Sequence, residues 1–146
     1  MTVWVNVLRE DKSLPMPEFN YEGDAGFDLR SAEDVVIYPN MPLPAKISTG
    51  MRFSIPLGYC MEVHSRSGLA AKNHLFVTNG PGIIDSVYTG IVYVLLTNLG
   101  EDPVHIKHGQ RIAQGIIKKL PEVIFKEVDT IKETKRGDKG FGSSGI

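Results

Sequence analysis

The sequence is organised as short runs of alternating apolar and polar residues, each closed by a turn signal. Between Ile47 and Ile55 every second residue is apolar or threonine, and the same period of two recurs near Val3–Val7 and Tyr59–Val63. A period of two places one set of side chains on a single face of a strand. Proline and glycine stand between the runs, as at 39–40, 56–58, 80–82, 99–100 and 108–109. Many short strands separated by turns predict an all-β sandwich, with the strands arranged as a distorted jelly roll or barrel.

The composition agrees with a β-rich fold in a single domain. The chain has 146 residues, of which 15 are glycine and 9 are proline, a combined share above the usual ~12%. Both residues break helices, which argues against a helix bundle. One short helix is expected at 67–72, and further strands at 35–38, 91–96, 104–106, 111–117 and 123–128. The β-branched run at 91–96 is expected to be buried on both faces.

The C-terminal end differs from the rest of the chain. Residues 132–146 begin with several charges, continue as a Gly-rich stretch and hold almost nothing apolar to bury. Such a segment stays mobile until something docks it. We therefore expect residues 1–131 to form a β-jelly-roll domain and residues 132–146 to form a flexible C-terminal arm.

The charge balance argues against several classes of function. With 16 basic and 17 acidic residues, the formal net charge is −1, which gives no basic footprint for duplex nucleic acid and no polybasic membrane signal. No apolar run approaches the ~20 residues of a membrane-spanning helix, and the first residues show no apolar signal core. A single cysteine, Cys60, excludes an internal disulfide. We expect a cytoplasmic protein without membrane or direct nucleic-acid contacts.

Two N-terminal segments carry residue types suited to chemistry, although each has a simpler structural explanation. Residues 25–32 (AGFDLRSA) place Asp28 between apolar neighbours, where a carboxylate can also simply cap a turn. Residues 64–70 (HSRSGLA) bring together the Arg66 guanidinium, the Ser67 hydroxyl and helix-start N–H groups. These are suitable donors for phosphate oxygens, but an ordinary N-cap by a serine would also explain them.

The third segment, residues 79–90 (NGPGIIDSVYTG), has the form of a Gly-rich hairpin whose backbone comes close to a ligand. Asp85 lies inside an apolar stretch. A carboxylate in such a stretch must be hydrogen-bonded or functional, and the alternative is a turn-forming aspartate.

The last two segments lie nearer the C-terminus. In residues 109–114 (GQRIAQ), alternation puts Arg111 on the opposite side of a strand from Gln114. In residues 136–145 (RGDKGFGSSG), the glycines let backbone N–H groups wrap an anion. Phe141 has no core to join there and is expected to meet a flat partner. The alternative for this segment is a disordered end.

Together and in this order, the five segments resemble the five motifs of the trimeric deoxyuridine triphosphate nucleotidohydrolases (dUTPases). The resemblance runs from about Ala25 to Gly145 and rests on AGFDLRSA, RSGLA, N-x-x-G-x-I-D-x-x-Y, RIAQ and RGDKGFGSSG. It implies a jelly-roll homotrimer with active sites shared between subunits. It also implies Mg²⁺-dependent hydrolysis of dUTP to dUMP and pyrophosphate, which keeps uracil out of DNA and supplies dUMP.

The resemblance further implies roles for individual residues. Asp85 would activate the attacking water, and Arg136 would neutralise charge on the leaving pyrophosphate. Asp28 would hold Mg²⁺ through water. The other matched residues would bind substrate: the phosphates by Arg66, Ser67, Gly68, Gln114, Gly142, Ser143 and Ser144, and the nucleoside by Asn79, Gly82, Ile84, Tyr88 and Phe141. The Asn79 hairpin would pair with the uracil edge, and Tyr88 would lie under the deoxyribose and exclude a 2′-hydroxyl.

Some positions depart from the family pattern, and two other functions stay open. Val87 and Thr89 stand where many members have an acid and an arginine, while Ser65 replaces a proline and Gln110 an aspartate. A dCTP deaminase of the same superfamily would use a glutamate and need no C-terminal GFGSSG. A non-catalytic nucleotide-sensing protein on this fold is the second alternative. If the source is viral, the expected location is inside a host cell.

Overall fold

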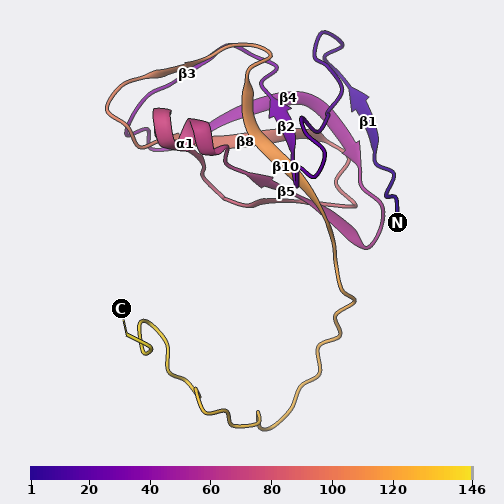
Figure 1. Cartoon of the computed structure of the whole chain (residues 1–146), viewed down its shortest axis with the longest axis vertical. Helices are drawn as coiled ribbons and strands as arrows, with labels where there is room; N and C mark the ends of the chain where they lie inside the picture. The colour runs from indigo at the N-terminus through magenta and orange to yellow at the C-terminus, as the bar shows by residue number, and fades with distance from the viewer. Residues whose placement is uncertain (146) are drawn as a thin grey trace.

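A computed structural model describes residues 1–145, in which short antiparallel strands form two facing sheets and one small extra ladder (Figure 1). The single helix of the described chain is α1, which confirms the expected helix at 67–72 and extends it by one residue. The elements are β1 (Asn6–Arg9), β2 (Phe27–Arg30), β3 (Val35–Ile37), β4 (Ala45–Ser54), β5 (Tyr59–His64), α1 (Ser67–Asn73), β6 (Leu75–Val77), β7 (Gly82–Asp85), β8 (Ile91–Asn98), β9 (Val104–Ile106) and β10 (Arg111–Lys119).

The strand order links segments that are far apart in the sequence. One sheet has the order β1-β4-β8-β6, the other β2-β10-β5-β7, and β3 pairs with β9. Every one of these pairings is antiparallel. The arrangement confirms the predicted all-β fold. It also places β2, β10, β5 and β7, which carry four of the five motifs, in one sheet.

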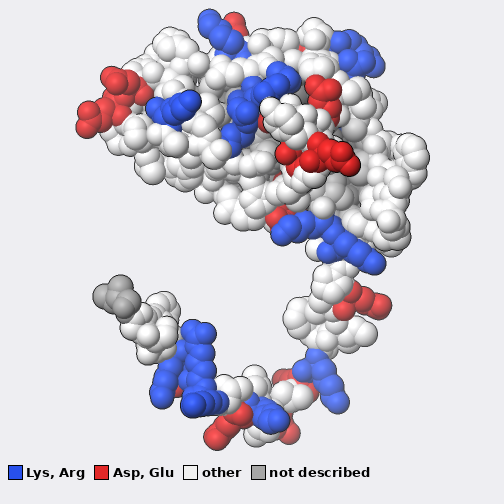
Figure 2. Space-filling view, viewed as in Figure 1, with Lys and Arg blue, Asp and Glu red and all other residues white. Residues whose placement is uncertain are grey.

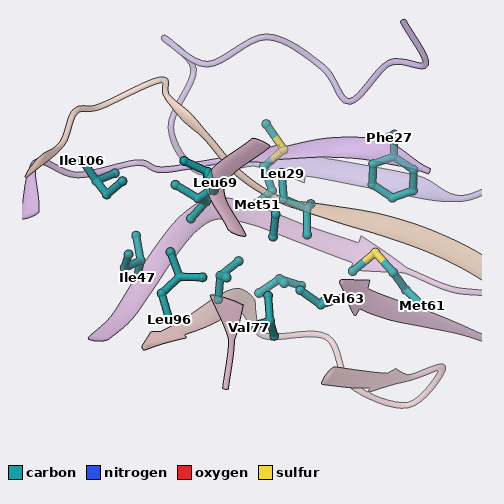
Figure 3. Packing of buried hydrophobic residues seen from close by; sticks show 14 of the residues in the cluster. Phe27, Leu29, Ile47, Met51, Met61, Val63, Leu69, Val77, Leu96 and Ile106 are labelled. Carbon is teal, nitrogen blue, oxygen red and sulfur yellow. The ribbon is translucent and has the colours of Figure 1, made fainter. Parts of the chain in front are cut away.

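The core lies between the two sheets and follows the predicted alternation (Figure 3). Ile47, Met51 and Phe53 of β4 are nearly inaccessible to solvent, and they meet Leu29 and Met61 of the other sheet within one apolar cluster. Each large apolar side chain buried in this way contributes about 1.5–3 kcal/mol to folding. The β strands that carry polar site residues are therefore anchored on their inner faces.

The strand expected near Val3–Val7 lies at Asn6–Arg9 instead, and two other strand predictions are wrong. The run at 91–96 forms β8 but is buried on one face only, since Val92 and Val94 are inaccessible while Tyr93 is 38% exposed. An antiparallel sheet can leave its outer face to solvent. Residues 123–128 form no strand, because β10 ends at Lys119 and the chain beyond it extends away from the sheets that would have to complete its hydrogen bonds (Figure 1).

The C-terminal segment extends away from the sheets (Figure 1). Residues 120–145 contain neither helix nor strand, and Ile124 and Phe125 are exposed. The proposed boundary at residue 131 falls inside this extended stretch, and the chain has neither helix nor strand on either side of it. Ile146, the last residue of the predicted arm, lies outside the described residues.

Candidate functional site

The first cleft is a polar hollow of about 650 Å³ beside the start of α1. It brings together five of the predicted residues, from β2, α1, β10 and the residue before α1: Asp28, Arg66, Ser67, Gly68 and Gln114. Arg111 also lines it, and sequence reasoning did not assign that residue to a site. The residues predicted to contact phosphate in motifs two and four therefore share one wall of the molecule.

Asp28 is held between two arginines at the centre of the first cleft. Its carboxylate oxygens lie 3.1 Å from Nε of Arg66 and 3.2 Å from Nε of Arg111. The Asn20 Nδ2 group also donates to Asp28 at 2.8 Å. The Asp28 side chain is only 12% exposed, whereas the two arginines are 31% and 41% exposed. This carboxylate fixes both guanidinium groups while leaving them open to a ligand from solvent.

A register shift explains why Arg111 faces this cleft. The ladder between β10 and β2 shifts between Arg111 and Ala113, and such a bulge re-aims the side chain before it. Arg111 and Gln114 consequently line the same cleft, so the prediction that they point to opposite sides of the strand is wrong.

The start of α1 is not capped by a serine. Arg66 occupies the N-cap position, in extended conformation and without a side-chain capping bond. The Ser65 hydroxyl instead accepts the backbone N–H of Val77 at 2.8 Å. The simple N-cap explanation for the HSRSGLA segment is therefore wrong, and Ser67 and Gly68 line the cleft.

The Gln114 amide is fixed from two directions. Its Nε2 donates to the Ser65 carbonyl at 2.9 Å. Its Oε1 lies against Gly26, where an added Cβ would come within 3.0 Å of that oxygen. A side chain at residue 26 would displace the Gln114 amide, so the glycine at this position has a direct role in shaping this wall.

The second cleft is smaller, about 290 Å³, and contains the residues of the third motif. Asn79, Ile84, Asp85 and Tyr88 line it, whereas Gly82 is buried behind it, with its Cβ position 3.1 Å from Asn79 Nδ2. The predicted hairpin does not form, because β6 belongs to one sheet and β7 to the other. The Gly-rich turn crosses between the sheets.

Asp85 stands at the end of β7 with its side chain exposed. The apolar residues before it do not bury the carboxylate, since β7 is an edge strand whose outward residues face solvent. An exposed carboxylate pays no desolvation cost and stays available to water.

Tyr88 is fixed beside Asp85 by a tight turn. Its backbone N–H donates to the Asp85 carbonyl at 3.0 Å, and its hydroxyl donates to the Ile91 carbonyl at 2.7 Å. Gly90 lies directly under the phenol, where a Cβ would be 2.7 Å from the Tyr88 oxygen. Only glycine fits at residue 90 with the ring in this place.

The fifth motif lies apart from both clefts (Figure 1). Arg136 Nε donates to the Lys139 carbonyl at 3.0 Å within the arm itself, and the Phe141 ring is fully exposed. Gly142, Ser143 and Ser144 are exposed as well. One chain thus presents the predicted residues in three separate groups.

The described residues offer no all-protein cage for Mg²⁺. No group of three His, Cys, Asp or Glu side chains within residues 1–145 could hold a metal ion. Both oxygens of Asp28 already face arginines. Mg²⁺ keeps several waters and binds through one or two carboxylates plus substrate phosphates, so a single carboxylate such as Asp28 fits an ion held mainly by its waters and by the phosphates of a ligand.

Among residues 1–145, three groups outside the two clefts have shifted pKa values. Hydrogen bonds from Ser13 and His108 lower the pKa of Asp11 to about 2. A hydrogen bond from His64 lowers the pKa of Glu62. Burial raises the pKa of the Cys60 thiol, which keeps it protonated and unreactive.

The surface charges are mixed. On the face shown in Figure 2, Lys and Arg side chains stand beside Asp and Glu side chains, and neither sign forms one large patch. Within residues 1–145, no helix has the length and apolar character needed to cross a membrane.

The fold and the two clefts define a class of protein. An antiparallel β sandwich presents paired guanidinium groups and hydroxyls in one cleft, and an exposed carboxylate beside a tyrosine in another. Guanidinium and hydroxyl groups bind phosphate oxygens, and a carboxylate can orient water. These features are typical of a hydrolase acting on a phosphate-bearing ligand.

Comparisons with known proteins identify the family. The family model described as dUTPase matches residues 12–145. The deoxyuridine 5′-triphosphate nucleotidohydrolase of Zymomonas mobilis is 47% identical over 139 residues, which cover 95% of this chain and 94% of that protein. The protein of the same name from Corynebacterium glutamicum is 44% identical and covers 97% and 94%. This chain belongs to the dUTPase family and is a hydrolase.

Solved structures agree with this assignment. The dUTPase of Staphylococcus bacteriophage 80alpha, solved with dUpNHpp, superposes with a TM-score of 0.89 at 34% identity and covers 99% of this chain and 100% of that one. A dUTPase mutant from S. aureus phage phi11, described as coordinating a structural Mg(II) ion, has a TM-score of 0.80 at 28% identity and covers 87% and 97%. The family assignment favours the hydrolase over the deaminase alternative.

Proposed function

We propose that this chain hydrolyses dUTP to dUMP and pyrophosphate. One observation carries the proposal beyond the family assignment. The residues assigned to phosphate in motifs two and four gather in the first cleft, while Asp85 and the nucleoside residues Asn79, Ile84 and Tyr88 gather in the second. The first cleft thus suits the phosphates of a nucleotide, and the second suits its nucleoside.

The chemistry begins at Asp85. Its exposed carboxylate orients a water molecule and accepts a proton as the water oxygen attacks the α-phosphorus in line. A new phosphorus–oxygen bond forms, the bond to the bridging oxygen breaks, and pyrophosphate leaves. Such transfer depends mainly on positioning and charge stabilisation, which the side chains around the phosphates supply.

The first cleft binds the phosphates. Arg66 donates from a position fixed by Asp28, and the Ser67 hydroxyl, the Gly68 backbone and the Gln114 amide stand beside it. Mg²⁺ carried on the triphosphate would neutralise phosphate charge, with Asp28 meeting its hydration shell.

The second cleft selects the nucleoside. Asn79, which packs against Gly82, and the backbone at Ile84 would pair with the uracil edge, and Tyr88, held over Gly90, would lie under the deoxyribose. A 2′-hydroxyl would clash with this ring, and a clash discriminates better than a missing methyl group does.

A complete site needs more than one chain. The two clefts and the arm are separate groups on one chain, which supports a homotrimer in which each site combines parts of different subunits. The arm, residues 132–146 beyond a domain of residues 1–131, would close over the substrate. Arg136 would then reach the leaving pyrophosphate, Phe141 would stack on uracil, and Gly142, Ser143 and Ser144 would contact the terminal phosphate.

We place the activity in the cytoplasm, or in a host cell if the source is viral, where it supplies dUMP and keeps uracil out of DNA.

Pyrophosphate release from dUTP, dCTP, dTTP and UTP, each with and without Mg²⁺, tests this function. We expect release from dUTP alone and only with Mg²⁺. Ammonia release from dCTP would instead support a deaminase. Binding of dUTP without turnover would support the nucleotide-sensing alternative, which no feature of the structure favours.

A further inference from the structure

The second cleft has a wall that the proposed chemistry leaves unused. Lys46 of β4 and Tyr93 of β8 line it together with Asn79, Asp85 and Tyr88. The two strands are paired, with Lys46 opposite Leu95 and Ser48 opposite Tyr93. Lys46 and Tyr93 are therefore diagonal neighbours on the outer face of one sheet, while Asp85 ends a strand of the other sheet.

The Lys46 ammonium has a defined place. Its Nζ lies 4.3 Å from the centre of the Tyr93 ring, within the range of a cation–π contact. Both side chains are exposed, so without the ring a lysine in this position would sample many rotamers in solvent. The ring restricts the charge to the rim of the cleft.

The positive charge of Lys46 lies where the proposed reaction brings two negative groups together. A carboxylate that orients water for attack on a phosphate carries the same sign of charge as that phosphate. The two groups repel each other at the distance that attack requires. Among the described residues that line the second cleft, Lys46 is the one cation.

We propose that Lys46, held by Tyr93, is a positioning residue that offsets the repulsion between Asp85 and the nucleotide phosphate nearest to it. This inference rests on the proposed function and adds a residue from the opposite sheet to that site. Lys46 acts through charge, so its effect falls on substrate binding more than on the chemical step. The effect also weakens as salt screens it.

Steady-state pyrophosphate release by the chain of residues 1–146, in low salt and in 1 M NaCl, tests the role of Lys46. Lys46→Met removes the charge and keeps the apolar stem, while Lys46→Arg keeps the charge. Lys12→Met is the matched control, because Lys12 is exposed and lines neither cleft. For scale, an ammonium and a phosphate oxygen taken to lie about 4 Å apart in water correspond to about a fivefold change when the pair is lost.

We expect Lys46→Met to raise KM for dUTP about fivefold in low salt, with little change in kcat, and to approach wild type in 1 M NaCl. We expect a KM for Lys46→Arg close to that of the wild type. Tyr93→Leu is expected to have a KM between those of the wild type and Lys46→Met, since the Lys46 charge remains but the ring no longer holds it. A second neutral variant, Lys46→Gln, is expected to give the same KM as Lys46→Met, which separates loss of charge from the shape of the new side chain, while recovery in 1 M NaCl excludes loss of folding.

Two results overturn the inference. One is a KM for Lys46→Met equal to that of Lys12→Met in low salt. The other is an Lys46→Arg variant as impaired as Lys46→Met, which would mean that shape rather than charge matters. Failure of the wild-type chain to release pyrophosphate from dUTP is a separate outcome, which refutes the proposed function itself.

Discussion

Replacing Asp28 with asparagine removes the negative charge that both arginines of the first cleft share. The change keeps the shape of the side chain and leaves Arg66 and Arg111 facing each other without a counter-charge. A hydrogen bond to a charged group contributes about 1.5–3 kcal/mol when buried, and an exposed ion pair about 0.2–1 kcal/mol. Asp28 is 12% exposed and its partners 31% and 41%, so the two pairs lie between these limits. We expect Asp28→Asn to lower the free energy of unfolding by about 1–2 kcal/mol.

Urea unfolding followed by circular dichroism, at one fixed protein concentration, measures this loss. With a slope of about 1–3 kcal/mol per molar urea, the midpoint falls by roughly 0.3–2 M, and by less in 1 M NaCl because salt screens the exposed partners. Asp24→Asn is the control, since Asp24 lines the same cleft and accepts the Tyr21 N–H at 2.9 Å. Within residues 1–145 Asp24 forms no ion pair with an arginine. Equal midpoints for the two variants would refute the account of Asp28 as a clamp on both guanidiniums.

Four further outcomes are expected. Asp85→Asn abolishes turnover and keeps nucleotide binding, so more than a few per cent of wild-type kcat would contradict its role. Deletion from Arg136 onward leaves a folded protein with severely reduced activity, and full activity would show that the arm is not part of the site. Gly90→Ala forces a Cβ to within 2.7 Å of the Tyr88 oxygen. This substitution is expected to lower stability by about 1–3 kcal/mol and to raise KM for dUTP. A wild-type KM would contradict the proposed position of the Tyr88 ring under the deoxyribose. The low pKa of Asp11, about 2 against 3.8 when unperturbed, stabilises the fold at pH values above 3.8 and loses this effect as pH falls toward 2. The difference in urea midpoint between wild type and Asp11→Asn should therefore shrink over that range, and a constant difference would contradict the assignment.

The sequence predicts the elements of this fold better than their neighbours in space. The alternation in β4 is confirmed because one face of that strand packs against the core. The same rule misplaces Arg111, because alternation holds only while the register is regular and β10 has a bulge there. Residues 123–128 have the composition of a strand, but composition carries no information about whether a free edge lies within reach.

The residues of the candidate site show the same limit. Asp28, Arg66 and Gln114 stand out through their motifs, and the structure brings them to one cleft. Lys46 and Tyr93 belong to no motif and reach the second cleft only because β4 pairs with β8. That relation depends on long-range strand pairing, which a local pattern does not encode.

The separation of the two clefts has a consequence for inheritance. If sites are shared as proposed, a chain without Asp85 and a chain without Arg66 each retain the part that the other lacks. Mixed assemblies of the two would contain some complete sites, so two genes that each encode an inactive chain would restore activity when expressed together. Defects within a single cleft would not complement each other, and such crosses would map which residues work as one unit.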